Sequence, residues 1–572
     1  MSKWPASRDR RSKYSVSCQL SLVLAALITL AGCQGISAAP SNPASVASVT
    51  VAASSATILP GKTHQFSATA KDARGNVITG VDFTWTSDVP SVATVDPDGL
   101  AIAVNQGTAH ISAAASGIAG SATVTVDTSA SRNAALFGLH VRSLSTPWPT
   151  IGFNGIRLWD TATRWAQIEK SPGVYDFSTL DSMLAEAYSH DVTTVIYTFG
   201  QVPQWASSNP TDSVCDYASW AGGGGCDLPT DINPDGSGTN QSWINFVTAL
   251  AHHVNDPTYL QTHAHIQYWE TWNEVFRNTV VTTFPWKIIS LRATYAQMVR
   301  MSEDLRCIVT GTGSVNGNPC TAPPIDATAK ILSPSGYGSP CCGLENTFQN
   351  FLYCNGTGKN APLPGSYCTT GSRGSAVVDI INSHFYTGIF QPENLAKNVK
   401  DYKALLSPTD LAKPLWSDED GWGQDSVVPD PDTQASWVAR YYLIGWSSGI
   451  SQMYWYAYDS NEFGTLWTLG GGLNKAGVAY GQTYNWIADS ALTTPCSARG
   501  TVWTCGLTLA NGNAAEAIWD TSQTCAEGNC TTSNQSVSSA WTNYQDLAGT
   551  NNVIANGRVA VGIKPVLLTP SP

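Results

Sequence analysis

Two segments of the chain place carboxylates directly after apolar, strand-like runs. The first reads Tyr-Trp-Glu-Thr-Trp-Asn-Glu over residues 268–274, and the second reads Trp-Ser-Asp-Glu-Asp over residues 416–420. Cleavage of a glycosidic bond requires two such groups, because one protonates the leaving oxygen while the other attacks the sugar or activates water. Glu274 and Glu419 are therefore the candidate acids, and Asn273 is a candidate hydrogen-bond donor to a sugar 2-hydroxyl.

Two further carboxylates, Glu270 and Asp418, lie in the same segments and could be mistaken for the reacting pair. Successive side chains of a strand point to opposite faces, so we expect these two to point away from a site that Glu274 and Glu419 share. A single glutamate after a strand is usually a solvated loop charge. Only the joint context of the two segments favours catalysis.

The elements that must position these residues follow an alternating pattern between residues 136 and 489. Eight apolar, strand-like runs occur at 137–141, 155–159, 194–199, 266–269, 331–333, 377–383, 414–416 and 451–455. Amphipathic helical patterns separate them, such as the apolar face from Trp243 to Val254. Alternating strands and helices in this number predict an α/β fold, a (β/α)8 TIM barrel with its site at the carboxyl ends of the strands.

Two β-rich regions flank the predicted barrel. Residues 46–127 alternate apolar and polar positions between turn signals, which predicts an immunoglobulin-like β-sandwich. Residues 490–572 carry short apolar strands and Asn-Gly turns, which predict a second small β-sandwich. The first region contains no paired catalytic groups, so we expect it to be a spacer rather than a glycan-binding module.

The N-terminal residues have the pattern of an export signal. Basic residues within the first 13 positions precede an apolar run from Leu20 to Ala31, which is shorter than the roughly 20 residues of a membrane-spanning helix. The sequence Leu-Ala-Gly-Cys at 30–33 resembles the lipobox of bacterial lipoproteins, in which the cysteine is lipidated. We expect residues 1–33 to be a lipoprotein signal peptide ending at Cys33, and residues 34–45 to be a linker.

This signal predicts where the protein acts. A lipidated Cys33 would anchor the exported chain in the bacterial cell envelope, at the outer membrane, because Gln34 is not the Asp that often signals inner-membrane retention. An ordinary cleaved signal with an incidental cysteine would instead release a secreted protein.

Composition narrows the range of partners. Only 13% of the residues are charged, the net charge is −12, and the chain contains 21 Trp and 21 Tyr. No basic block follows residue 13, so nucleic acid is not an expected partner. An aromatic-rich and charge-poor chain suits a neutral polar ligand with flat apolar faces, and carbohydrate is the expected ligand.

The cysteines fit an oxidising compartment. Two of the 14 lie in the N-terminal signal region, which leaves an even number, twelve. Close spacing favours the pairs Cys215–Cys226, Cys496–Cys505 and Cys525–Cys530, and the cysteines between 341 and 368 could staple one long loop. The chain has no CxxC pair and no HExxH segment, so we expect neither a metal site nor a cofactor.

The order of these motifs resembles a known group of enzymes. The segments that carry the resemblance are Gly-Ile-Arg-Leu-Trp-Asp at 155–160, Val-Pro-Gln-Trp-Ala-Ser at 202–207, Ser-His-Phe-Tyr at 383–386, Tyr-Trp at 454–455 and the two carboxylate segments. With these residues the barrel resembles the retaining glycoside hydrolases of clan A, and family 39 in particular. Residues 46–127 resemble the bacterial immunoglobulin-like group 2 domain.

The resemblance implies a role for each matching residue. Glu274 would be the general acid/base and Glu419 the nucleophile of a double displacement. Arg157 would orient the nucleophile and keep it ionised, and Tyr386 would donate a hydrogen bond to it.

Four further residues would support the reaction or bind the sugar. Trp455 would form the floor under the sugar at subsite −1, and His384 would support the acids. Trp159 and Trp205 are either sugar platforms or core residues.

Two functions from different classes remain at this stage. The first is a retaining glycoside hydrolase that acts on a β-linked poly- or oligosaccharide, with transglycosylation as a variant. Its candidate substrates are a xylan, an arabinan, a glucan or an exopolysaccharide. The second is a surface glycan-binding lipoprotein without turnover. The acid pair with its supporting Arg, Asn and Tyr favours the enzyme, because a binding protein does not need both acids.

Segments 207–239 and 313–370 are long for βα connections, and we expect them to cover the site.

Overall fold

The computed structural model describes residues 45–52, 55–58, 63–104, 107–126, 133–212, 223–275, 291–336, 350–353 and 373–571. They form two compact units that divide between Asp127 and Thr128. The expected signal peptide, the linker and Cys33 lie outside the described residues, as do Cys215 and the cysteines from 341 to 368. Among the described residues, no helix is long and apolar enough to span a membrane.

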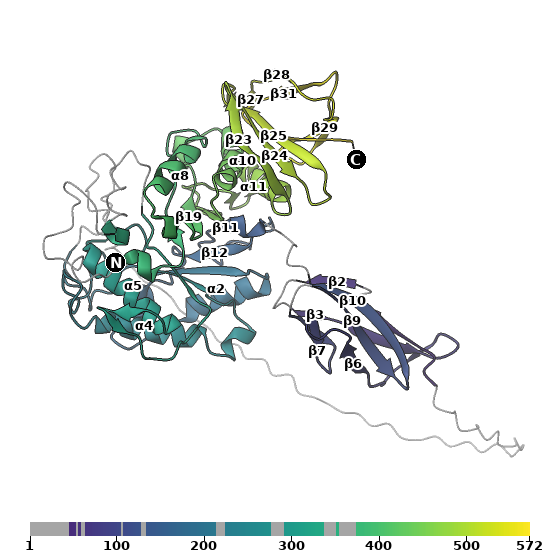
Figure 1. Ribbon diagram of the computed structural model, residues 1–572, viewed down its shortest axis with the longest axis horizontal. Coiled ribbons are helices and arrows are strands. Elements are labelled where there is room, and N and C mark those ends of the chain that lie inside the picture. Colours follow the sequence, from purple (N-terminus) through teal and green to yellow (C-terminus); the bar gives the residue numbers. More distant parts are fainter. Residues whose placement is uncertain are drawn as a thin grey trace, which may run out of the picture. The chain divides into compact units, whose positions relative to one another are not determined.

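The first unit is a small β-sandwich (Figure 1). Its two longest strands, β9 (Gly107–Ala115) and β10 (Ile118–Val126), pair as an antiparallel hairpin. Every second residue is buried from Ala109 to Ala115 in β9 and from Ala122 to Val126 in β10. This period of two is expected where one face of a strand packs into a core. The other strands are β1 (Ser48–Ala52), β2 (Ser55–Ile58), β3 (Thr63–Gln65), β4 (Ser67–Lys71), β5 (Val77–Ile78), β6 (Thr84–Ser87), β7 (Ala93–Val95) and β8 (Leu100–Ala103). The predicted immunoglobulin-like sandwich is confirmed.

Eight parallel strands form the barrel of the second unit. They are β11 (Phe137–Leu139), β12 (Gly155–Leu158), β13 (Thr194–Thr198), β14 (Tyr268–Glu270), β17 (Lys330–Leu332), β18 (Ile381–Asn382), β19 (Leu415–Asp420) and β20 (Gln452–Trp455). They follow the order β17-β14-β13-β12-β11-β20-β19-β18, and a parallel bridge between Leu332 and Ile380 connects the two ends of this sheet. Six of them consist entirely of buried residues, as expected for a closed parallel sheet. The predicted barrel is therefore confirmed.

Helices between the strands surround the barrel. They are α1 (Trp165–Ile168), α2 (Ser178–Ser189), α4 (Gln241–Val254), α5 (Tyr295–Thr310), α7 (Gly374–Val377), α8 (Asn394–Ala404), α9 (Pro408–Leu411), α10 (Pro431–Ser447) and α11 (Lys475–Ile487), with short turns η1 (Ala134–Leu136), η2 (Tyr259–Gln261) and η6 (Asp425–Val427). The face of α4 from Trp243 to Val254 is buried, as its apolar spacing predicts. Two hairpins lie in the connections, β15 (Ser314–Val315) with β16 (Asn318–Pro319) and β21 (Trp467–Thr468) with β22 (Gly472–Leu473).

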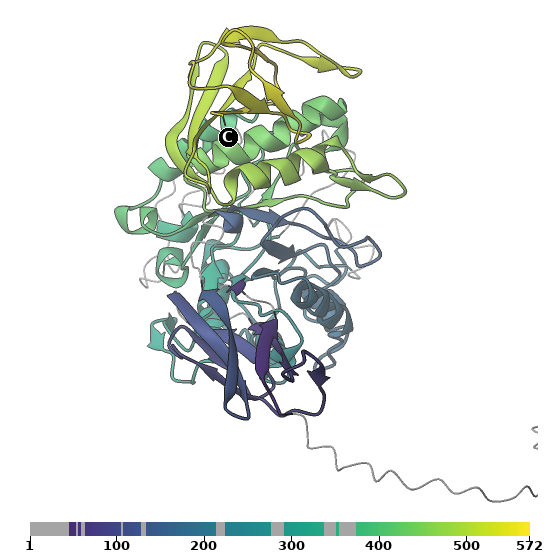
Figure 2. The ribbon, with the colours of Figure 1, turned by 90° about the vertical axis from the view of Figure 1, so that its right-hand side faces the viewer.

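The C-terminal part of the second unit is a set of antiparallel sheets. Its strands are β23 (Ala491–Arg499), β24 (Val502–Thr508), β25 (Ala514–Asp520), β26 (Cys525–Ala526), β27 (Asn529–Cys530), β28 (Ser533–Ser536), β29 (Asn543–Gln545), β30 (Asn551–Val553), β31 (Arg558–Val561) and β32 (Val566–Thr569). Figure 2 shows this yellow sandwich lying over the green helices of the barrel. Leu507 and Trp519 belong to the same apolar core as the barrel helices, so the two parts are packed together.

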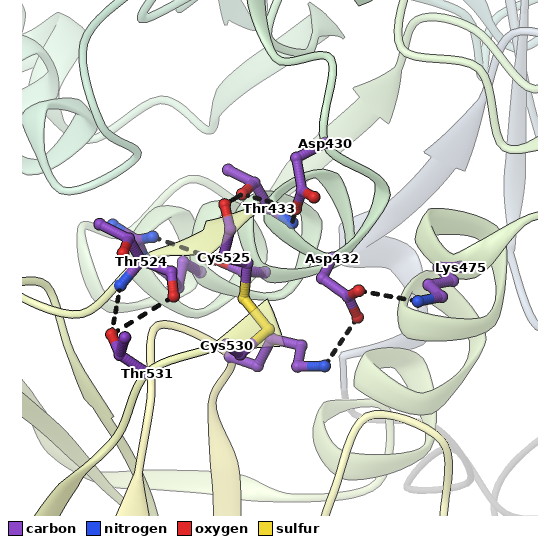
Figure 3. Close-up of a disulfide and its surroundings, with 11 residues drawn as sticks. Asp430, Asp432, Thr433, Lys475, Thr524, Cys525, Cys530 and Thr531 are labelled. Carbon is purple, nitrogen blue, oxygen red and sulfur yellow. Dashed lines mark hydrogen bonds and ion pairs between the residues drawn. A yellow bond between two sulfur atoms is a disulfide. The ribbon is translucent and has the colours of Figure 1, made fainter. Parts of the chain in front are cut away.

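An ion-pair cluster holds the sandwich to α10 (Figure 3). Asp432, near the start of α10, accepts from Lys475 of α11 at 2.7 Å and from Lys564 of the sandwich at 2.8 Å. The disulfide between Cys525 and Cys530 closes the β26–β27 turn beside this cluster.

Two of the disulfides predicted from spacing are confirmed, Cys525–Cys530 and Cys496–Cys505. Cys307 and Cys320 form a further disulfide, which the spacing of the cysteines did not predict. Cys226 is disulfide-bonded, but its predicted partner Cys215 lies outside the described residues.

Candidate active site

Arg157 on β12 connects the two carboxylate segments. Its side chain is fully buried and its Nη1 donates to Oε2 of Glu419 at 2.9 Å. From the other segment, Oε2 of Glu270 accepts from Nη2 at 2.6 Å, and Oδ1 of Asn273 accepts from the same nitrogen at 2.7 Å. Asp418 completes the set, with its Oδ2 at 2.8 Å from Nε. Burial alone would lower the pKa of Arg157, but the surrounding carboxylates outweigh it and raise that pKa.

Glu419 is held by a donor on each carboxylate oxygen. The Tyr386 hydroxyl donates to Oε1 at 3.0 Å, and Arg157 donates to Oε2. Burial raises the pKa of Glu419, and His384 and Arg157 lower it only in part. The net direction is the opposite of the one that the resemblance implies for Arg157, because burial and the nearby carboxylate of Glu274 outweigh the cation.

Glu274 follows β14 with a left-handed backbone, at φ 45°. A side chain in this region costs about 1–3 kcal/mol, and such residues cluster at functional sites. The backbone N–H of Glu274 donates to Oγ of Ser335 at 3.0 Å, which supports the unusual conformation. The carboxylate is 11% exposed, and its Oε1 lies 3.2 Å from Nδ1 of His384.

His384 lies between the carboxylates. Its Nδ1 is 3.2 Å from Glu274 and 3.9 Å from Oε1 of Glu419, and its Nε2 is 3.2 Å from Oδ1 of Asp418. Burial by itself would lower the pKa of His384, but the three carboxylates outweigh it and raise the pKa well above its usual value. This direction favours the imidazolium form of the ring, which can donate from both nitrogens.

Glu274, His384 and Glu419 each place one ligand atom within 4.8 Å of the others, and so do Glu270, His384 and Asp418. Carboxylates and a histidine can hold a divalent metal ion. Here, however, Arg157 already pairs with Glu270, Asp418 and Glu419, and the raised pKa of His384 favours a cationic ring, which cannot bind a metal ion. The described donor set therefore fits a charge-paired network better than a metal centre.

The expectation that Glu270 points away from the site is wrong. Its side chain is fully buried in the barrel interior, where Oε2 accepts from Arg157 and from the Thr198 hydroxyl at 2.6 Å. Its Oε1 accepts from the backbone N–H of Ser335 at 2.9 Å. Burial raises the pKa of Glu270 to about 8. Strand alternation did not support the expectation for Glu270, because residues four apart share a face of a strand and Glu274 lies beyond the end of β14.

The same expectation is wrong for Asp418, because the strand is irregular at this point. The pairing of β19 with β20 shifts register between Ser417 and Asp420. A bulge interrupts the strict alternation of a strand, so that Asp418 and Glu419 both reach Arg157. Burial favours a higher pKa for Asp418, but Arg157 and His384 outweigh it and lower that pKa.

The predicted tryptophans differ in exposure. Trp455 is fully buried, donates from Nε1 to the carbonyl of Gly464 at 2.6 Å, and packs edge-to-face on Trp422. Trp159 is 5% exposed, and the guanidinium of Arg164 lies 4.2 Å from its ring centroid. Trp205 is half-buried and donates from Nε1 to the carbonyl of Glu169 at 3.0 Å. The roles of these three in sugar binding stay predictions.

Sequence reasoning did not select two residues near the predicted site. His140 follows β11, and its Nε2 lies 2.8 Å from the carbonyl of Asp418, while burial lowers the pKa of His140 to about 3. Asp160 accepts hydrogen bonds from Tyr456 and Arg164. Asp160 belongs to the matched segment 155–160, and Tyr456 directly follows the matched residue Trp455, so these positions were the available signal.

Comparison with known proteins identifies one domain by sequence. Residues 45–126 match the family described as Bacterial Ig-like domain (group 2). A comparison of the sequence with curated proteins gave no match.

Solved structures resemble the chain at low sequence identity. A family 39 glycoside hydrolase from the gut symbiont Bacteroides cellulosilyticus WH2 is 14% identical, with a TM-score of 0.50, over 91% of this chain and 99% of that chain. The catalytic domain of a GH30 xylanase C from Talaromyces cellulolyticus is 14% identical, with a TM-score of 0.43, over 74% of this chain and 88% of that chain. A bacterial Ig-like domain containing GH10 xylanase from termite gut is 13% identical, with a TM-score of 0.35, over 75% and 98%. The similarity to the family 39 glycoside hydrolase shows that the two chains share a fold.

Proposed function

We propose that this protein is a retaining glycoside hydrolase. The observation that carries the proposal is the spacing of the acid pair: a carboxylate oxygen of Glu274 lies within 4.8 Å of one of Glu419. Retaining enzymes need their two carboxyl groups roughly 5–5.5 Å apart, whereas inverting enzymes keep them roughly 6.5–9.5 Å apart to admit a water. Oxygens this close favour the shorter of the two separations, at which Glu419 can attack the anomeric carbon directly.

In the first step, an oxygen of Glu419 forms a bond to the anomeric carbon while the bond to the leaving oxygen breaks. Glu274 gives its proton to that oxygen. Tyr386 and Arg157 hold the attacking carboxylate through one oxygen each, which reduces its freedom to rotate. The imidazolium of His384 stabilises the carboxylate that forms on Glu274.

In the second step, Glu274 removes a proton from water, the water oxygen bonds to the anomeric carbon, and Glu419 is released. Asn273 assists in both steps. Its Oδ1 accepts from Arg157, so the orientation of the amide is set and its NH2 can donate to the sugar 2-hydroxyl. A sugar in place of the water would give transglycosylation.

We further propose that the substrate is an extracellular β-linked poly- or oligosaccharide. An Ig-like domain and disulfides fit an exported protein. In this proposal residues 1–33 are a signal peptide, residues 34–45 are a linker, and Cys33 carries the lipid. Radiolabelled palmitate should enter the unsubstituted protein in the cell envelope and not a Cys33→Ser variant.

A hydrolysis screen tests the catalytic proposal. Three proteins are compared: the full chain with Cys33→Ser, and the same chain with Glu274→Ala or Glu419→Ala added. Each is incubated with aryl β-glycosides, xylan, arabinan and β-glucan. Turnover on at least one substrate, lost in both variants, and a first product with retained anomeric configuration by NMR are expected. Glycan binding without turnover would instead support the non-catalytic lipoprotein, and an inverted product would contradict the double displacement.

A further inference from the structure

A second concave surface lies on the barrel, apart from the carboxylate site. It is a wide, open hollow of about 740 Å³. Three segments line it: the residues before α2, the C-terminal end of α4 and the stretch around η2. It shares no residue with the carboxylate site (α2 and α4 are labelled in Figure 1).

Aromatic rings dominate this surface. The ring of Phe177 stacks on His253 at a centroid distance of 4.2 Å and on Tyr175 at 5.8 Å. Tyr259 continues the row at 4.9 Å from His253, and its ring stacks on His263 at 3.8 Å. All five residues are half-buried, and all of them except His263 line the hollow.

The rings are held in place by hydrogen bonds behind them. Oδ1 of Asp181 accepts from the Tyr259 hydroxyl at 2.8 Å and lies 2.7 Å from Nε2 of His253. The backbone N–H groups of Thr258 and Tyr259 both donate to Oδ1 of Asp256, which fixes the chain at the start of η2. A surface that is already ordered loses little conformational entropy when a ligand binds.

The residues around the hollow select a neutral ligand. The nine described residues that line it include no Lys or Arg and one carboxylate, Asp256, which is engaged with the backbone. The rim offers exposed polar groups from His252, Thr258 and Thr262. Flat apolar rings surrounded by hydroxyl and imidazole groups match a sugar ring, which has apolar faces and polar edges. The openness of the hollow suits a chain that crosses it rather than an enclosed small molecule.

We propose that this hollow is a secondary binding site for a neutral polysaccharide chain. Its ligand class follows from the residues that line it, and its role, which is to hold the polymer near the carboxylate site, rests on the proposed function. Apolar contact of the sugar rings with the row of aromatic side chains would provide the affinity.

Electrophoretic retention in native gels tests the site. The full chain carries Cys33→Ser, which removes the lipidated cysteine, and Glu274→Ala, which prevents turnover. The gels contain xylan, arabinan or mixed-linkage β-glucan. Ala249→Arg fills the hollow without removing a ring, and Tyr259→Ala removes a ring. Each should weaken retention on the bound polymer at least threefold. Ala412→Arg, at an exposed position outside the hollow, is the matched control and should migrate as the parent.

A second measurement separates this site from catalysis. In the active chain, Ala249→Arg should leave kcat/KM on a soluble aryl β-glycoside unchanged while lowering it on the retained polymer. Equal retention of the parent and Ala249→Arg, or no retention of the parent on any of the three polymers, would overturn the proposal. Because retention is measured without turnover, its result is independent of whether the proposed hydrolysis occurs.

Discussion

Nδ1 of His384 lies 3.2 Å from Oε1 of Glu274, and Nε2 of the same ring lies 3.2 Å from Oδ1 of Asp418. One imidazolium therefore connects a carboxylate proposed to exchange protons with one that is buried in the barrel. Asp418 also pairs with Arg157, so the orientation of the ring is set from below the site. This relationship makes His384 a positioning residue with an electrostatic effect on both acids of the pair.

Replacing His384 by Ala should shift the pH profile of the enzyme. His384 lowers the pKa of Glu419, which must be ionised to attack, so loss of the cation should raise that pKa further. The acid limb of kcat/KM against pH should therefore move to higher pH. His190→Ala, at an exposed position, is the control and should leave the limb unchanged. An acid limb that moves to lower pH would contradict this assignment.

Glu274→Ala should be rescued by an external nucleophile. Loss of general acid/base catalysis costs about 10²–10⁴-fold in rate, and less when the leaving group needs no protonation. Azide can attack the intermediate in place of activated water, because the missing side chain leaves space beside Glu419. We expect azide to restore turnover of a dinitrophenyl β-glycoside and to yield a β-glycosyl azide, detected by NMR.

The matched variant Glu419→Ala cannot form the covalent intermediate. Azide would then attack from the opposite face and give an α-glycosyl azide. The same azide anomer from both variants would show that the two roles are wrongly assigned.

Arg157→Met should destabilise the second unit strongly. It leaves the buried carboxylates of Asp418 and Glu419 without their shared cation, and breaking a buried pair costs about 3–5 kcal/mol in free energy of unfolding. Lys397→Met removes an exposed cation that pairs with Asp401, and it should cost less than about 1 kcal/mol. Denaturant unfolding measures both changes. Equal losses of unfolding free energy in the two variants would contradict a buried network of ionised carboxylates around Arg157.

Glu270→Gln should make stability less dependent on pH. Burial raises the pKa of Glu270 from 4.5 to about 8, so the folded state holds its proton more tightly than the unfolded state. This stabilisation is complete below about pH 4.5 and is lost as the pH rises through 8. A Gln keeps the neutral form at every pH, so its stability relative to the parent should increase from pH 5 to pH 8.

Thermal unfolding at a series of pH values measures this effect. Glu527→Gln, at an exposed turn, should follow the parent across the range. A pH dependence in Glu270→Gln that equals that of the parent would contradict a protonated Glu270.

Much of the architecture follows from local pattern. The eight apolar runs predicted the barrel, because a parallel strand buried on both faces is apolar along its length. The segments of Glu274 and Glu419 lie at strand ends, and the topology of a barrel brings such ends to one face. Close spacing likewise predicted Cys496–Cys505, whereas Cys307–Cys320 required the chain between α5 and β16 to fold back.

The network under the site depended on tertiary structure. Alternation within a strand predicted that Asp418 points away, but pairing with β20 introduces a register shift, and pairing is a property of two strands. The position of Glu270 inside the barrel depends on Arg157, which lies 113 residues earlier in the chain. The sequence by itself determined which residue types stand at the strand ends. Only the folded barrel decided which of them share a cation, because that depends on distances between strands that no local pattern records.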